Sequence, residues 1–119
     1  MNAEIATLWQ EALLSGKYEQ GRSALNSGGK LCCLGVLCEV AIQQGLQLNK
    51  IKQRNSYGYG AERAYGFLPQ EVMEWADIKT MRGALYPNSP SSASLALLND
   101  NGNTFSEIAE VIGKVADQL

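Results

Sequence analysis

Residues 57–67 contain the side chains in this sequence that are best suited to recognising a ligand. The segment reads Tyr57-Gly58-Tyr59-Gly60-Ala61-Glu62-Arg63-Ala64-Tyr65-Gly66-Phe67. Tyrosine rings provide rigid, flat surfaces for stacking, and glycines allow backbone amides to come close to a bound group. Arginine binds phosphate and carboxylate oxygens through paired hydrogen bonds. With polar and cationic residues before it, this segment predicts a site for an anionic, nucleotide-like ligand, formed by Tyr18, Gln20, Arg22, Arg54, Tyr57, Tyr59, Arg63 and Tyr65.

Each residue type in this predicted site has a role. The three arginines would bind phosphates, Gln20 would read the hydrogen-bonding edge of a base, and the tyrosines would stack on the base or border it. Stacking on an aromatic ring is worth about 1–3 kcal/mol per base. The segment has no phosphate-binding loop and no dinucleotide fingerprint, so we expect no cofactor. In a second interpretation, the tyrosine rings only cover the edge of the core.

Few residues are available for catalysis. The sequence has no histidine, which removes the usual general base and the most common metal ligand. Its three cysteines, Cys32, Cys33 and Cys38, lie in an apolar stretch, and a zinc site would need a fourth ligand. Their odd number does not fit a disulfide framework, so we interpret them as reduced, buried side chains in a reducing cytoplasm. We therefore expect a protein that is not an enzyme, with no catalytic residue and no metal ligand.

The charge distribution favours an anionic partner only locally. The net charge is −2, yet residues 17–63 carry seven lysines and arginines against three acidic residues. Residues 64–119 carry seven acidic residues against three basic ones. A protein that binds duplex DNA usually has a stronger basic footprint, and no apolar run approaches the roughly 18 residues that a membrane span needs. We therefore expect neither duplex DNA nor a membrane as a partner.

Hydrophobic periodicity predicts one domain over residues 1–119, mainly α, with at most a small two-stranded hairpin. Residues 31–42 are apolar or glycine except for Glu39, so a helix over 32–44 must be surrounded by the rest of the protein. We expect four to five helices, packed around this buried central helix. Gly35 within it is expected to permit a close approach of another backbone segment.

The remaining elements are predicted from cap residues and periodicity. Helices are expected after Asn2, with Pro69 in the first turn of a short helix, over residues 92–100 with Ser91 or Ser92 as the cap, and from the capping box Thr104-Phe105-Ser106-Glu107 onward. The small hairpin is expected near residues 22–33, and residues 46–67 are expected to be irregular. Trp9 and Trp75 are expected to pack on the central helix.

Four short motifs follow one another along nearly the whole chain. They are Trp9-x-x-Ala12-Leu13-x-Ser15-Gly16-x-Tyr18-x-Gln20, Cys32-Cys33-Leu34-Gly35-Val36-Leu37-Cys38-Glu39, Leu68-Pro69-x-x-Val72-x-x-Trp75 and Leu98-Asn99-Asp100-x-Gly102-x-Thr104-Phe105-x-x-Ile108-Ala109. Their order and spacing resemble a group of small bacteriophage and prophage proteins. The resemblance implies a viral accessory protein that acts in a bacterial cytoplasm by binding something of the host. It implies no cofactor and no catalytic residue.

Two functions follow as the main hypotheses, and the third alternative is an enzyme that uses carboxylates, tyrosines, lysines or thiols, although no pair of these has a spacing that demands it. In the first, the protein binds and sequesters an anionic, nucleotide-like small ligand as a means of countering host defence. In the second, the same loop binds a protein, and the chain inhibits a host enzyme or defence complex, since tyrosine and arginine are enriched in interface hot spots. A homo-oligomer that holds its ligand between subunits is compatible with both hypotheses.

Overall fold

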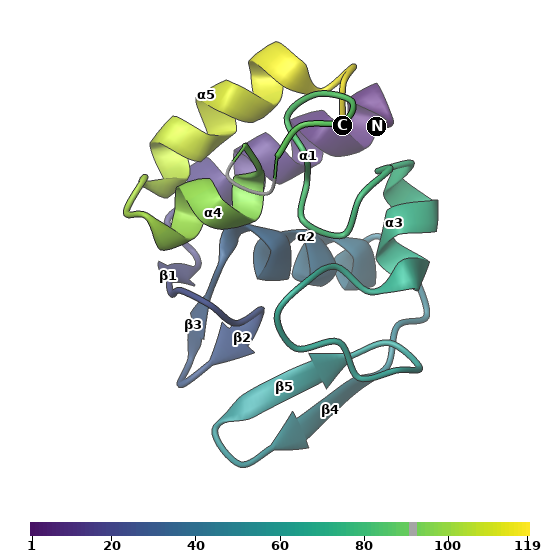
Figure 1. Cartoon of the computed structure of the whole chain (residues 1–119). Coiled ribbons are helices and arrows are strands. Elements are labelled where there is room, and N and C mark those ends of the chain that lie inside the picture. The colour runs from purple at the N-terminus through teal and green to yellow at the C-terminus, as the bar shows by residue number, and fades with distance from the viewer. Residues whose placement is uncertain (91–92) are drawn as a thin grey trace.

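The computed structural model, which describes residues 1–90 and 93–119, shows an α+β fold (Figure 1). Its helices are α1 (Ala3–Leu14), α2 (Cys33–Gln43), α3 (Gln70–Ala76), α4 (Leu95–Asp100) and α5 (Phe105–Val115). Its strands are β1 (Glu19–Gln20), β2 (Asn26–Ser27), β3 (Lys30–Leu31), β4 (Lys50–Gln53) and β5 (Ser56–Tyr59). They form one sheet in the order β1-β3-β2-β5-β4, in which β1 is parallel to β3 and the other neighbours are antiparallel.

The prediction of a mainly α fold with at most a small two-stranded hairpin is wrong, because the described chain contains a five-stranded sheet. The hairpin expected near residues 22–33 is present as β2 and β3. Gly28 and Gly29 form its two-residue turn at φ 61° and 81°, and the favoured turn of this length needs positive φ at both positions. Strands β4 and β5 lie in the stretch 46–67, which was expected to be irregular.

The β4–β5 hairpin escapes prediction because its strand signals are weak. Strand β4 reads Lys50-Ile51-Lys52-Gln53, with one apolar side chain, and Gly58 interrupts β5. The turn between them begins at Arg54 with φ 56°, where glycine or asparagine is the usual residue. Pairing of Ser56 with Ser27 of β2 adds the hairpin to the sheet. No local sequence pattern predicts that contact.

Helix α2, predicted over residues 32–44, is the centre of the fold. In Figure 1 it lies between the α1–α5 pair and the sheet, and eight of its 11 residues are buried. Trp9 of α1 is fully buried and donates its indole N–H to the carbonyl of Cys33 at 2.9 Å, and Trp75 of α3 packs against the core. Although α2 is apolar nearly all round, no described helix is long and apolar enough to cross a membrane.

Gly35 is the point where α2 crosses another backbone segment. A methyl group at Gly35 would overlap the carbonyl oxygen of Leu25. The close approach expected at this glycine is therefore confirmed. It allows the chain that enters β2 to lie directly on the helix, with no side chain between them.

Asn99, at the end of α4, connects three parts of the fold and is fully buried. Its Oδ1 accepts hydrogen bonds from the backbone N–H of Cys33 at 3.1 Å and from Nε2 of Gln20 at 2.9 Å. Its Nδ2 donates to the carbonyl of Gly21 at 2.8 Å. Cys32, the N-cap of α2, makes no side-chain cap, so Asn99 supplies an acceptor that the first turn of this helix needs.

The other helix starts follow the cap residues. Asn2 caps α1, and Thr104 with Glu107 forms the capping box of α5, both as predicted. Pro69 is the N-cap of α3. The predicted caps Ser91 and Ser92 lie outside the described residues, and the observed N-cap of α4 is Ser94, whose side chain accepts from the N–H of Leu97.

Candidate functional site

The eight residues predicted to bind an anionic ligand lie in several different surroundings. Gln20 is bound on all sides within the chain, since its Nε2 donates to Asn99 and to the carbonyl of Asn103, and its Oε1 accepts from the N–H of Phe105. Its side chain therefore joins β1 to the α4–α5 connection. Tyr18 is half-buried between α1 and α2, where its hydroxyl accepts a hydrogen bond from Gln43 at 3.0 Å.

Tyr59 is fully buried beneath the sheet. Its hydroxyl donates to Oε2 of Glu39 at 2.6 Å and accepts from Nδ2 of Asn26 at 3.1 Å. Burial, together with the hydrogen bond to the Glu39 carboxylate, raises the pKa of the Tyr59 hydroxyl. Lys50 completes this cluster, because its Nζ lies 2.9 Å from Oε2 of Glu39 and 4.7 Å from the centre of the Tyr57 ring. The cluster holds the β4–β5 hairpin on α2.

The three arginines of the predicted site are exposed and make no ion pair with any residue that the structure describes. Arg54 lies in the β4–β5 turn, and Arg63 follows β5, with a positive φ of 55°. Arg22 lies near Gly102, on the α4–α5 connection. Arg54 and Arg63 therefore both belong to the β4–β5 hairpin and the chain that packs on it, whereas Arg22 lies beside the α4–α5 connection.

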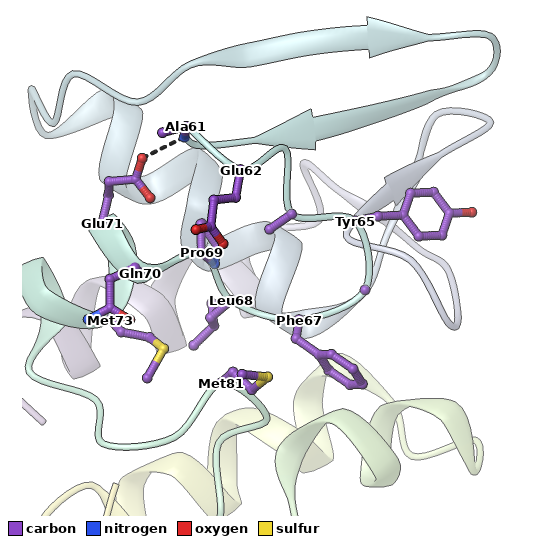
Figure 2. A pocket seen from close by; sticks show the side chains of 12 residues that line it. Ala61, Glu62, Tyr65, Phe67, Leu68, Pro69, Gln70, Glu71, Met73 and Met81 are labelled. Atoms are coloured by element: carbon purple, nitrogen blue, oxygen red, sulfur yellow. Dashed lines mark hydrogen bonds between the residues drawn. The ribbon is translucent and has the colours of Figure 1, made fainter.

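The chain after β5 lines a different site, a cavity of about 500 Å³ that includes Tyr65 (Figure 2). We call it the 61–81 cavity, and the residues that line it are Ala61, Glu62, Ala64, Tyr65, Gly66, Phe67, Leu68, Pro69, Gln70, Glu71, Met73 and Met81. Most of this lining is apolar. Tyr65 is the one residue of the predicted set that it contains.

Large apolar side chains remain exposed around the 61–81 cavity. Tyr65 is 49% exposed, Phe67 39% and Met81 50%. In Figure 2, Met73 of α3, Met81 and Phe67 follow one another along one side of the cavity, and the Tyr65 side chain extends away from them. Three partly exposed large side chains therefore belong to one cavity, and exposed apolar side chains gathered at one place are typical of interaction sites.

Backbone contacts hold the walls of this cavity in place. The N–H of Leu68 donates to the carbonyl of Met81 at 2.9 Å, which brings the 79–83 segment beside the 66–69 segment. The N–H of Ala61 donates to Oε2 of Glu71 at 2.7 Å, which fastens the chain after β5 to α3. The carbonyl of Tyr65 accepts from the N–H of Leu25 at 2.7 Å. Hydrogen bonds therefore hold in place the backbone segments that carry the exposed apolar side chains.

Arg82 contacts the exposed ring of Phe67. Its guanidinium carbon lies 4.8 Å from the centre of the Phe67 ring, a cation–π contact that fixes one face of this ring. Arg82 itself does not line the 61–81 cavity.

The sequence did not identify Phe67, Met73 or Met81 as site residues. Phe67 and Met81 are large apolar residues in connections that are otherwise rich in polar residues and glycine. This sequence context was the one signal for the exposure that both side chains show. The meeting of Met81 with Met73 depends on the Leu68–Met81 hydrogen bond, which sequence spacing does not predict.

The cysteines offer no reactive thiol at this site. Cys32, Cys33 and Cys38 are free and buried, as predicted. Burial raises the pKa of all three thiols, most strongly for Cys33 and Cys38, so the thiolate form that reacts with electrophiles is suppressed. Among the residues that the structure describes, no group of three or more His, Cys, Asp or Glu side chains is placed to hold a metal ion.

Comparison with known proteins finds one family. Residues 1–116 match a family described as a domain of unknown function (DUF8296). No curated protein and no solved structure gives a significant match to the chain.

Proposed function

The chain belongs to the DUF8296 family, and we propose that it is a protein-binding module, not an enzyme, that holds a segment of a partner polypeptide in the 61–81 cavity. The single observation that carries this proposal is the group of exposed apolar side chains, Tyr65, Phe67 and Met81, around one anchored cavity. Exposed apolar patches of this kind mark interaction sites. Methionines suit a peptide-binding surface, because the flexible thioether adapts to different side chains.

The lining of the cavity favours a polypeptide over an anionic small ligand. Its charged residues are Glu62 and Glu71, and it contains no lysine or arginine. Two carboxylates would repel phosphate groups. A partner side chain that enters the cavity would instead exchange water for apolar contact, worth roughly 25 cal/mol for each Å² of apolar surface buried.

The resemblance to phage and prophage proteins suggests the kind of partner and the compartment, a bacterial cytoplasm, in which the chain would act. The partner would be a bacterial host protein, and the chain would act by occupying a surface of a host enzyme or defence complex. In this form the proposal retains the second hypothesis drawn from the sequence.

Selection from a random peptide library displayed on phage tests the proposal. The wild-type protein is expected to enrich peptides that share an apolar residue, and these peptides should not bind the Met81→Glu variant, in which a carboxylate enters the apolar patch. Leu14→Glu is the matched control, because Leu14 is 60% exposed on α1 and does not line the cavity. Thermal melting of both variants checks that they fold.

Two results would contradict the proposal. One is the absence of any enriched peptide on the wild-type protein. The other is equal binding of the enriched peptides to wild type and Met81→Glu, which would place their contact outside the cavity.

A second candidate function, binding of an anionic ligand, is favoured by the charges of the β4–β5 hairpin. Lys52 and Arg54 are exposed there and form no ion pair with a described residue. Lys50 lies over the Tyr57 ring beside them. A thermal-shift screen of nucleotides, cyclic dinucleotides included, tests this function. A rise in Tm that Arg54→Ala abolishes supports it, and unchanged Tm at ligand concentrations far above micromolar would contradict it.

A further inference from the structure

The 61–81 cavity combines an apolar lining with two carboxylates that lack cationic partners. Neither Glu62 nor Glu71 forms an ion pair with any described residue, whereas Glu19, Glu39 and Glu110 each do. In Figure 2 the Glu62 side chain extends toward Pro69, and the Glu71 side chain extends from α3 to the N–H of Ala61, the residue before Glu62. Negative charge is therefore concentrated at the end of the cavity that the 61–62 segment and α3 form.

Half of the Glu71 carboxylate is free for a ligand. Its Oε2 accepts the hydrogen bond from Ala61, and its Oε1 accepts none from the described residues. Every fully enclosed side-chain nitrogen or oxygen in the described chain has a partner. Because Oε1 of this half-buried residue has none, it is not fully enclosed, and it can accept a further hydrogen bond.

Charge beside an apolar surface selects its ligand more strongly than charge in bulk water. Ligand atoms that displace water from the cavity lower the local dielectric, which strengthens attraction to a cation and repulsion of an anion. An ammonium or guanidinium group would also donate hydrogen bonds to the open carboxylate oxygens.

From these observations we propose that the polypeptide segment bound in the 61–81 cavity carries a lysine or arginine next to its apolar anchor residue. The anchor contacts Phe67, Met73 and Met81, and the basic group contacts Glu62 and Glu71. This inference rests on the proposed function, because it specifies the chemistry of the same partner.

The geometry favours a chain segment over a small organic cation. A cavity of about 500 Å³ exceeds what one anchor side chain needs, and its exposed rim of Tyr65, Phe67 and Met81 offers contact surface outside the cavity as well. A segment of polypeptide covers both, whereas a small cation would leave the rim in contact with water. Small ligands usually bury most of their own surface in enclosed sites.

The experiment is a pair of selections from the same random peptide library. One uses the wild-type protein, and the other uses the Glu62→Gln/Glu71→Gln double variant. Glutamine at position 71 keeps a side-chain oxygen that can accept the Ala61 hydrogen bond, so the cavity wall is expected to persist. The wild type should enrich apolar residues with a neighbouring lysine or arginine, and the double variant should enrich the apolar residue without the basic neighbour.

Titration of the enriched peptides then measures the effect. Methyl NMR of the three methionines reports the site directly, since Met73 and Met81 line the cavity and Met1 does not. Exchange of the peptide's basic residue for glutamine should weaken binding about two- to fivefold, and exchange for glutamate should weaken it further. Added salt should reduce these differences.

A matched variant separates local charge from net charge. Glu74→Gln removes one negative charge from the exposed face of α3, outside the lining of the cavity, and the glutamine keeps an oxygen that can accept the hydrogen bond from Gln70. It should bind the basic peptides as the wild type does, whereas Glu62→Gln should bind them about two- to fivefold more weakly.

The possible failures are distinguishable. If peptides are enriched and shift the Met73 and Met81 methyl signals, but without preference for a basic residue, the inference is overturned and the proposed function stands. Equal loss of binding in Glu74→Gln and Glu62→Gln would also overturn the inference. If no peptide is enriched at all, the proposed function itself fails.

Discussion

The hydroxyl of Tyr59 donates a 2.6 Å hydrogen bond to the carboxylate of Glu39, and this contact joins the sheet to the central helix. Glu39 is the one charged residue of α2, and it also lies 2.9 Å from the ammonium group of Lys50. A carboxylate that is only partly exposed needs such partners, because burial of an unpaired charge is costly. The single charge in the apolar helix is therefore the point at which the β4–β5 hairpin attaches.

Tyr59→Phe is expected to lower the free energy of unfolding by about 2 kcal/mol, because Glu39 and Asn26 each lose a buried hydrogen-bond partner. Urea denaturation at neutral pH measures the change. Tyr65→Phe is the control, because the Tyr65 ring is 49% exposed, and this variant should stay within about 0.5 kcal/mol of the wild type. Equal stability of the two variants would show that the Tyr59–Glu39 contact does not stabilise the fold.

The contribution of Tyr59 should also depend on pH in the alkaline range. Burial and the Glu39 carboxylate raise its pKa above the ordinary value of 10.0, so the folded state holds the hydroxyl proton more tightly than the unfolded state does. The stabilisation is therefore complete below pH 10 and is lost as the pH rises further. The stability difference between wild type and Tyr59→Phe should shrink above pH 10. A difference that grows with pH would contradict this assignment.

Asn99→Ala is expected to destabilise the protein by about 2–4 kcal/mol, because the backbone N–H of Cys33, the amide of Gln20 and the carbonyl of Gly21 all lose their partner. Chemical denaturation followed by circular dichroism measures the loss. Asn101→Ala provides the control, since Asn101 is exposed at the end of α4. Comparable losses in both variants would contradict the role of Asn99 at the start of α2.

Gly35→Ala is expected to lower stability by about 4 kcal/mol or more, or to prevent folding, because the added methyl group would overlap the Leu25 carbonyl. Gly113→Ala is the matched control, as both glycines lie inside helices. At Gly113 the methyl group would meet the flexible end of Gln10, so the change should stay within about 1 kcal/mol. Normal melting of Gly35→Ala would refute the close contact between α2 and residue 25.

The three cysteines should react with a maleimide on the order of 100-fold or more slowly in the native protein than in urea, because they are buried and reaction requires opening of the fold. Mass spectrometry of samples quenched over time measures the labelling. Ser106→Cys, at an exposed position on α5, supplies a fast-reacting internal reference. Labelling of the native cysteines at the rate of Ser106→Cys would show that α2 is accessible.

The helices could be predicted because their signals are local. Helix α5 begins at a capping box and buries Phe105, Ile108 and Ile112 on one face, and both features are visible within a dozen residues of sequence. Helix α2 was recognised from its apolar composition alone. In these elements, each residue's neighbours along the chain are also the residues that determine its conformation.

The joining of the strands into one sheet could not be predicted, because two of its pairings link strands that are not consecutive in the chain. Strand β1 pairs with β3 through Glu19 and Lys30, and β2 pairs with β5 through Ser27 and Ser56. Each contact joins residues far apart in the sequence, and three of the strands are two residues long. Such short segments have too few side chains to show alternation, so tertiary packing decides their conformation.

In the candidate site, too, local sequence features could be read from the sequence, whereas contacts between distant segments could not. The aromatic and glycine residues at 57–67 overlap the segment that lines the cavity, and Tyr65 is common to the predicted site and the lining. The strand that forms over 56–59 buries Tyr59 beneath the sheet, a consequence that could be seen only once the strand was known. Met81 reaches the cavity through a backbone contact with Leu68, which no spacing rule describes.

Strand β4 ends the sheet, so one side of its backbone is open to pairing with another polypeptide. Two lysines, Lys50 and Lys52, lie on this outer strand, and charged side chains on a border strand discourage such pairing. The lysines of β4 therefore protect this edge of the sheet from edge-to-edge association with other chains. Under the proposed function, a partner would therefore contact side chains in the 61–81 cavity and would not add a strand beside β4.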